Sequence, residues 1–234
     1  MTERARPLVI GHRGAPRERP ENTLPSFLRA LELEADGIEL DVHCTKDRVV
    51  VVHHDEIPRA TPPSGQLAGR RIDSLTFDEL QGFSVRGLAL ISTLAEALAV
   101  IKGRAFVFVE LKGVGIEREV VEVIRASIAP ERCAVHSFDH AQIARARALA
   151  PELRGGILFD RAVADAAASM RAASALDVWP SREHVTEALV REVHDAGGRV
   201  IPWTVNDPKQ AATLAALGAD GLCTDFISVV RAAL

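Results

Sequence analysis

The stretch GIELDVHCTKDRVVVVHHDE, residues 37–56, contains two apolar runs joined by a short polar connection. Little more than CTKDR separates GIELDV (37–42) from VVVVHH (49–54), and that is too short for a crossover helix. We therefore expect the second run to return antiparallel to the first, as a hairpin. Because neighbouring side chains of a strand point to opposite faces, His53 and His54 should face different sides of this hairpin.

Besides GIELDV (37–42), the chain has seven further apolar runs of strand length. Longer, alanine-rich amphipathic segments separate these runs. Alternation of strands with helices of this length predicts parallel strands joined by right-handed crossovers. Eight such strands in one chain favour a closed (β/α)8 TIM barrel, and no GxGxxG follows the first strand, as a dinucleotide-binding sheet would require. The expected strands are residues 8–12, 37–42, 105–111, 133–138, 155–159, 176–180, 200–205 and 221–225.

The returning run of the hairpin is additional to these eight strands. If the preceding strand overshoots the rim of the barrel, the hairpin brings His53 and His54 to the C-terminal mouth, where barrel enzymes keep their active sites. Residues 56–91 are long and begin with many Pro and Gly residues, so we interpret them as an insertion over the mouth, with a short helix at TFDELQGF (76–83). No linker interrupts the rest, so we expect residues 1–234 to form a single domain.

The bulk composition narrows the class of protein. With 47% hydrophobic and 26% charged residues, the chain is an ordinary soluble globular sequence, and a net charge of −4 without a basic run argues against a nucleic-acid partner. No stretch matches a signal peptide or a membrane span, so we expect no stable membrane association. Cys44, Cys133 and Cys223 have no metal-type spacing, and their odd number argues against a disulfide framework, which favours the cytoplasm.

Side chains suited to proton transfer or metal binding are concentrated at the expected strand ends. Residues two apart on a strand share a face, so a strand can present two of them toward the barrel axis. The groups are His12 and Arg13 on the first strand, Glu39 and Asp41 on the second, Glu110 and Lys112 on the third, and His53, His54 and Asp55 on the hairpin.

Carboxylates inside a barrel need compensation, because an unpaired buried charge is very costly. Salt bridges to Arg13 and Lys112 would be a sufficient explanation for any single acid. For Glu39, Asp41 and Glu110 together, beside two bases and two histidines, we favour a metal site. Their hard oxygen ligands suit Mg²⁺ or Ca²⁺ and not zinc.

A set of motifs extends over nearly the whole chain: GHRGA, PENTLPSF, IELDVHCTKDRVVVVHHD, VELK, HSFD, WTVN and GADGLCTD. This set resembles the glycerophosphodiester phosphodiesterase family, a branch of the phospholipase C-like phosphodiesterase barrels. The combination is far more specific than any one motif. The chain departs from the family pattern in two places. Ser92 stands where the family usually has Pro, and the inserted segment is short. Both departures bear on the choice of substrate more than on the chemistry.

The resemblance implies one divalent metal ion, Mg²⁺ or Ca²⁺ with Mn²⁺ as a further option, bound by Glu39, Asp41 and Glu110. It also implies Glu21 nearby. Glu21 belongs to PENT, which has a structural alternative: its Asn or Thr could cap the helix that follows.

The resemblance further implies that His12 and His54 act as the acid/base pair and that Arg13 and Lys112 hold the phosphate. The family pattern is a histidine followed directly by aspartate, which here selects His54 over His53. We expect His53 on the opposite face of the hairpin, under the inserted segment, as a packing or hydrogen-bonding residue.

The activity implied is hydrolysis of a glycerophosphodiester, a small-molecule partner, to glycerol 3-phosphate and an alcohol. Trp203 and Phe138 lie at strand ends and are candidates to pack against the alcohol or the glycerol, with core packing as the alternative. Two other functions stay open: a related phospholipase D-like enzyme acting on lysophospholipids, and a catalytically inactive barrel that binds a phosphate ligand. The sequence does not specify the alcohol, the metal, the oligomeric state or which histidine is the acid.

Overall fold

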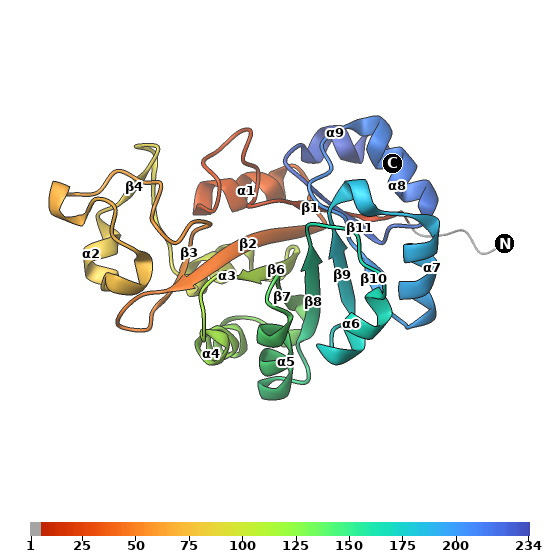
Figure 1. Ribbon diagram of the computed structural model, residues 1–234. Coiled ribbons are helices and arrows are strands. Elements are labelled where there is room, and N and C mark those ends of the chain that lie inside the picture. The colour runs from red at the N-terminus through yellow and green to blue at the C-terminus, as the bar shows by residue number, and fades with distance from the viewer. Residues whose placement is uncertain (1–5) are drawn as a thin grey trace.

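A computed structural model describes residues 6–234, which form a barrel of parallel strands with helices around it (Figure 1). Each strand is hydrogen-bonded to the next in the order β10-β9-β8-β7-β6-β2-β1-β11. The (β/α)8 barrel predicted from the sequence is therefore confirmed. The strands are β1 (Leu8–Gly11), β2 (Gly37–Cys44), β6 (Phe106–Leu111), β7 (Cys133–Ser137), β8 (Arg154–Phe159), β9 (Asp177–Pro180), β10 (Arg199–Val200) and β11 (Gly221–Thr224).

The barrel closes between β10 and β11 through backbone hydrogen bonds outside the regular ladder. The N–H of Cys223 donates to the carbonyl of Pro202 at 3.0 Å, and the N–H of Val205 donates to the carbonyl of Cys223 at 2.8 Å. Strand β10 ends at Val200, earlier than the expected residues 200–205, because Pro202 has no N–H to donate.

Within residues 6–234, eight helices cover the outside of the barrel, and each buries an apolar stripe against the strands. Helix α3, for example, starts at Thr93 with a reciprocal capping box to Glu96 and buries Leu94, Leu98 and Ile101. The eight are α1 (Leu24–Glu32), α3 (Leu94–Ile101), α4 (Glu117–Ser127), α5 (His140–Leu149), α6 (Ala166–Ala172), α7 (Glu187–Asp195), α8 (Pro208–Leu217) and α9 (Ile227–Arg231). None of the helices within residues 6–234 has the length and apolar character to cross a membrane.

The barrel interior is filled by an apolar layer with polar side chains above it. Ile10, Phe108, Ala134, Leu158, Trp179, Ile201 and Cys223 form one buried cluster that lies apart from the core between strands and helices. Two residues beyond Phe108 and Ala134, toward the carboxyl ends of their strands, come Glu110 and His136. The two-residue period of a strand thus places these polar groups on the same inward face, at the mouth.

The hairpin predicted after β2 is present. Strand β3 (Val50–Val52) pairs antiparallel with β2, with Val52 opposite Val42, and the N–H of His53 still donates to the carbonyl of Asp41 at 3.0 Å. Strand alternation divides its side chains. Val50 and Val52 pack into the main core, whereas Val51 faces the other way.

The segment 56–91 builds a small core of its own on that other face. Val51 clusters with Ile72, Leu75, Leu80 and Phe83 and with other apolar residues of the segment. The segment projects beside β3 at the left of Figure 1. It contains the expected short helix, α2 (Phe77–Gln81), followed by the two-stranded pair β4 (Ser84–Val85) and β5 (Ala89–Leu90).

Candidate active site

A cavity of about 150 Å³ opens at the mouth of the barrel. Its walls come from all eight barrel strands or the residues that follow them, and from His54, which follows β3. No residue of the segment 56–91 lines it. The lining residues are His12, Arg13, Glu39, His54, Glu110, Lys112, His136, Phe138, Leu158, Trp179, Trp203 and Cys223.

Three buried side chains at the centre of this cavity could share one cation. Glu39, Glu110 and His136 each offer a ligand atom, and these atoms lie within 4.8 Å of one another. Among residues 6–234, Glu39 Oε1, Asp41 Oδ1 and His136 Nδ1 are buried with no hydrogen-bond partner. Buried polar atoms are normally paired, so the two carboxylate oxygens fit a divalent cation that would accept their lone pairs.

The register of the sheet explains how these groups meet. Asp41 on β2 is paired with Glu110 on β6, and Glu110 is paired with His136 on β7. Glu39 lies one inward position below Asp41 on β2. Inward side chains of neighbouring parallel strands therefore lie side by side at one level of the barrel.

Crowding of carboxylates shifts their proton affinities. Burial, together with the negative charges of Asp41 and Glu110, raises the pKa of Glu39 well above its ordinary value. Burial and the charge of Asp41 raise the pKa of Glu110 to about 8. Burial would also raise the pKa of Asp41, but the positive charges of Arg13, His54 and Lys112 outweigh burial and lower it. A bound divalent cation would relieve this repulsion.

Arg13 connects the first loop of the barrel to the acidic centre. Its backbone N–H donates to Glu39 Oε2 at 3.0 Å, its Nε lies 3.2 Å from Asp41 Oδ2, and its Nη1 donates to Glu21 Oε1 at 3.0 Å. Asn22 also holds Asp41, donating from Nδ2 to the same Oδ2 atom at 2.8 Å. Glu21 is absent from the cavity wall, and 38% of its side chain is exposed.

Each of the two predicted acid/base histidines has an aspartate on its Nδ1. His12 Nδ1 lies 2.7 Å from Asp225 Oδ1, and Asn206 donates to the other oxygen of Asp225 at 2.9 Å. His54 Nδ1 lies 2.7 Å from Asp55 Oδ1. A carboxylate at Nδ1 fixes the tautomer with the proton on that nitrogen, so Nε2 is left to exchange protons with a ligand.

Lys112 joins His54 to the acidic centre. Its Nζ lies 3.2 Å from His54 Nε2 and donates to Glu110 Oε1 at 3.1 Å. Burial is the main cause that lowers the pKa of His54. On the opposite side of the hairpin, His53 is buried and its Nε2 accepts the N–H of Arg59 from the segment 56–91 at 3.1 Å.

Aromatic side chains form one wall of the cavity. Phe138 and Trp203 meet edge to face with ring centroids 5.5 Å apart, and 43% of Phe138 is exposed. Deeper in, the His136 ring stacks on Trp179 at 4.5 Å. Trp203 and Phe138 thus offer a rigid apolar surface at the rim, while Trp179 supports His136.

The structure places most of the residues predicted from the sequence in the lining of one cavity: His12, Arg13, Glu39, His54, Glu110, Lys112, Phe138 and Trp203. Asp41 is buried beneath it, in contact with Arg13. Two polar groups went unassigned: His136 in the acidic centre and Asp225 behind His12. Both signals were in the sequence, since HSFD and GLCTD end strands with those residues on inward positions.

A closed (β/α)8 barrel with carboxylates, histidines and two basic side chains in a cavity at its mouth defines the class of barrel enzymes, which carry their reactive groups at that end. The model of the family described as "Glycerophosphoryl diester phosphodiesterase family" matches residues 12–229, and the chain belongs to this family. It is accordingly an enzyme of the phosphoric diester hydrolase class.

Individual relatives agree with this assignment. The chain is 32% identical to a glycerophosphodiester phosphodiesterase of Caldanaerobacter subterraneus subsp. tengcongensis, over 96% of this chain and 98% of that protein. It is 31% identical to one of Bacillus altitudinis, over 93% and 94% of the respective chains. Among solved structures, it is similar to an Oleispira antarctica phosphodiesterase in complex with the product sn-glycerol-3-phosphate, with a TM-score of 0.86 and 26% identity over 97% and 96% of the chains.

Proposed function

We propose that the protein hydrolyses glycerophosphodiesters to glycerol 3-phosphate and an alcohol, using one divalent cation and the acid/base pair His12 and His54. The observation that carries this proposal is the shared cavity, in which two aspartate-backed histidines flank a buried cluster of unpaired carboxylate oxygens. The Oleispira antarctica relative, crystallised with sn-glycerol-3-phosphate as its product, supports the choice of substrate.

We assign the cation to Glu39, Asp41 and Glu110, with His136 beside them. Glu21 was expected near the metal, but its contact with Arg13 and its exposure favour a role in positioning that arginine. Mg²⁺ or Ca²⁺ suits the oxygen donors, and a ring nitrogen of His136 would also suit Mn²⁺. When bound, the cation supplies positive charge to the phosphoryl oxygens and the nucleophile.

The basic side chains bind the phosphate in this proposal. Arg13 presents a planar, permanently charged fork to the phosphoryl oxygens, held in place by Asp41 and Glu21. Lys112 adds a point charge between Glu110 and His54. The aromatic rim formed by Phe138 and Trp203 packs against the glycerol.

The histidines move the protons. One removes a proton from the nucleophile through its Nε2, and the other donates a proton to the departing alkoxide. Asp225 and Asp55 stabilise the imidazolium that forms on His12 or His54 during this exchange. The buried wall around Trp179 and Cys223 limits access of bulk water.

We further propose a cytoplasmic location, a small-molecule substrate and no nucleic-acid partner. The net charge of −4 supports the last point, because polyanions bind basic surfaces. The three cysteines are free and buried in the structure, which agrees with a reducing compartment.

Phosphorus NMR of the reaction products tests the proposed reaction. With glycerophosphoethanolamine as substrate, the signal of the diester should be replaced by that of glycerol 3-phosphate. Formation of phosphoethanolamine instead would mean that the other ester bond is cleaved, and the proposal would be wrong.

A further inference from the structure

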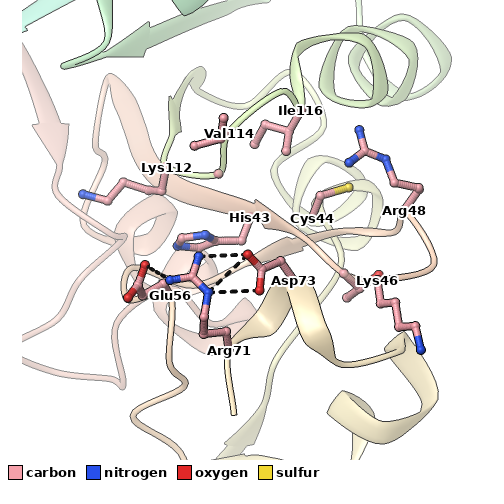
Figure 2. A pocket seen from close by; sticks show the side chains of 12 residues that line it. His43, Cys44, Lys46, Arg48, Glu56, Arg71, Asp73, Lys112, Val114 and Ile116 are labelled. Carbon is pink, nitrogen blue, oxygen red and sulfur yellow. Dashed lines mark hydrogen bonds and ion pairs between the residues drawn. The ribbon is translucent and has the colours of Figure 1, made fainter. Parts of the chain in front are cut away.

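A second cavity, of about 240 Å³, lies beside the catalytic one (Figure 2). Three segments build it: the end of β2 with the hairpin turn, the segment 56–91, and the loop that follows β6. A pocket of this volume is below the range for drug-sized ligands and suits one small alcohol. Its walls include His43, Lys46, Glu56, Arg71, Lys112 and Val114.

The two cavities adjoin at Lys112. Lys112 lines both of them, and its Nζ lies 3.2 Å from His54 Nε2 on the catalytic side. His43 also lines the second cavity, and its Nε2 lies 3.0 Å from the backbone carbonyl of His54. Figure 2 shows both side chains at the same end of the cavity. A diester whose phosphate lies at Lys112 can therefore extend one of its arms into this space.

The second cavity has a polar wall built largely of ion pairs. Four basic side chains line it, namely Lys46, Arg48, Arg71 and Lys112, with the two carboxylates of Glu56 and Asp73. Two of the basic side chains are paired with acids outside the lining, Arg48 with Glu119 and Lys112 with Glu110. Figure 2 shows Arg71 between those two carboxylates, and its Nη2 donates to Asp73 Oδ2 at 2.8 Å. Glu56, Arg71 and Asp73 thus form an ion-paired floor of the cavity. This floor exposes hydrogen-bond donors and acceptors together, and a polyhydroxyl group can bond to both.

The same wall is unsuited to a quaternary ammonium group. None of its twelve lining residues is Phe, Trp or Tyr, so it has no aromatic face for a cation–π contact. Arg71 also pairs with both carboxylates of the wall, Glu56 and Asp73, so neither is free to pair with a cationic alcohol. The catalytic cavity, by contrast, carries Phe138, Trp179 and Trp203.

We propose that the second cavity binds the leaving alcohol and selects hydroxylated, uncharged alcohols such as inositol or glycerol over trimethylammonium alcohols such as choline. This inference rests on the proposed function. The smaller catalytic cavity holds the invariant glycerol phosphate, and the larger polar one holds the arm that varies between substrates. Arg71, Glu56 and Asp73 make the segment 56–91 the part of the chain that sets specificity.

Filling the cavity tests its occupancy. Val114 is 89% exposed, so Val114→Trp should fold while narrowing the space. We expect kcat/KM for glycerophosphoinositol to fall at least roughly tenfold, the size of a lost subsite contact, with glycerophosphomethanol unaffected because a methyl group does not reach the cavity. Equal loss on both substrates would mean that the cavity holds the glycerol, and no loss on either would mean that it is not a subsite. Each result overturns the proposal.

Changing the charge of the floor tests selectivity. Arg71→Gln leaves Glu56 and Asp73 without their cation, so kcat/KM for glycerophosphocholine relative to glycerophosphoinositol should rise roughly threefold to tenfold. Arg191→Gln is the matched control, since this exposed arginine pairs with Glu187 on α7 and lines neither cavity. An unchanged ratio in Arg71→Gln would overturn the proposal.

The wild-type enzyme separates failure of this inference from failure of the proposed function. If the wild type hydrolyses these glycerophosphodiesters but neither variant changes the ratio of kcat/KM between them, only the subsite proposal is wrong. If the wild type hydrolyses no glycerophosphodiester at all, the proposed function itself is wrong.

Discussion

His53 and His54 are consecutive in the chain but differ in their environments. His54 lines the catalytic cavity with Asp55 on its Nδ1, whereas His53 is buried against the backbone of Arg59. Strand alternation is the cause, because Val52 belongs to the main core and the next two side chains must diverge. One residue of register therefore decides which histidine faces the cavity.

Removal of either cavity histidine should abolish most turnover. His54→Ala and His12→Ala should each lower kcat by on the order of 10²–10⁴, the usual contribution of a positioned acid or base. His53→Ala should mainly lower the melting temperature. A well-folded His53→Ala enzyme without activity, beside an active His54→Ala enzyme, would show that the two roles are reversed.

The buried His53 should make the fold sensitive to acid. Burial lowers its pKa from 6.5 to about 4, so the folded state stays neutral at this site while the unfolded chain takes up a proton below pH 6.5. The contribution of neutral His53 to the free energy of unfolding is complete above pH 6.5 and is lost as the pH falls toward 4. A pKa shift of this size corresponds to about 3 kcal/mol.

His53→Gln provides the measurement. Glutamine can still accept the Arg59 N–H but does not titrate, so its unfolding free energy should fall less steeply between pH 6.5 and 4 than that of the wild type. Parallel stability–pH curves for the two proteins would show that His53 does not contribute to acid sensitivity.

Arg13 should be sensitive even to a change that keeps its charge. Its backbone takes a positive φ of 57°, and its guanidinium reaches both Asp41 and Glu21. Arg13→Lys retains one positive charge but loses the planar fork, so kcat/KM should drop clearly below that of the wild type. Wild-type kinetics in Arg13→Ala would instead mean that the arginine only neutralises a barrel carboxylate.

At the scale of secondary-structure elements, the amino end of the barrel is held by a buried charge at the start of β9. Asp177 has no exposed surface, and it accepts hydrogen bonds from Arg154 at 2.7 Å and from Arg199 at 2.8 Å. Those arginines begin β8 and β10, so one carboxylate joins three neighbouring strands.

Asp177→Asn should therefore be costly although it is nearly isosteric. Losing the charge weakens three hydrogen bonds from arginines at a buried site. We expect this to lower the free energy of unfolding by about 3 kcal/mol. Asp160→Asn is the control, because its pair with Arg161 is exposed and should contribute under about 1 kcal/mol. Equal denaturation midpoints for the two variants would contradict this account.

The elements that follow from local pattern were predictable, and those that depend on tertiary contacts were not. The hairpin followed from the short connection between two apolar runs, and the capping box of α2 lies where TFDELQGF predicted a helix. The early end of β10 and the small core on Val51 depend on the geometry of barrel closure and on contacts across the segment 56–91.

The same division holds within the site. Glu39, Asp41 and Glu110 were identified as a group because each is an acid at an inward position of a core strand. His136 and Asp225 were missed as partners because a histidine or an aspartate after an apolar run is also typical of a structural strand end. Only the register of neighbouring strands shows that they meet Glu110 and His12.

At the scale of the whole molecule, closure of the barrel assembles the site. His12 and Asp225 are 213 residues apart in the chain, and they meet because β1 pairs with β11. The acidic centre likewise takes its groups from β2, β6 and β7. Because a cation bound there would join three strands, it should raise the melting temperature as well as support turnover.

The central claim is that this mouth is a divalent-metal phosphodiesterase site, and a coupled assay for glycerol 3-phosphate tests it most directly. The enzyme is freed of metal with a chelator, the metal content is checked by elemental analysis, and turnover of a glycerophosphodiester is followed as Mg²⁺, Mn²⁺ or Ca²⁺ is returned. We predict no turnover after chelation and recovery with at least one of these ions. Full activity in protein shown to contain no metal would contradict the account.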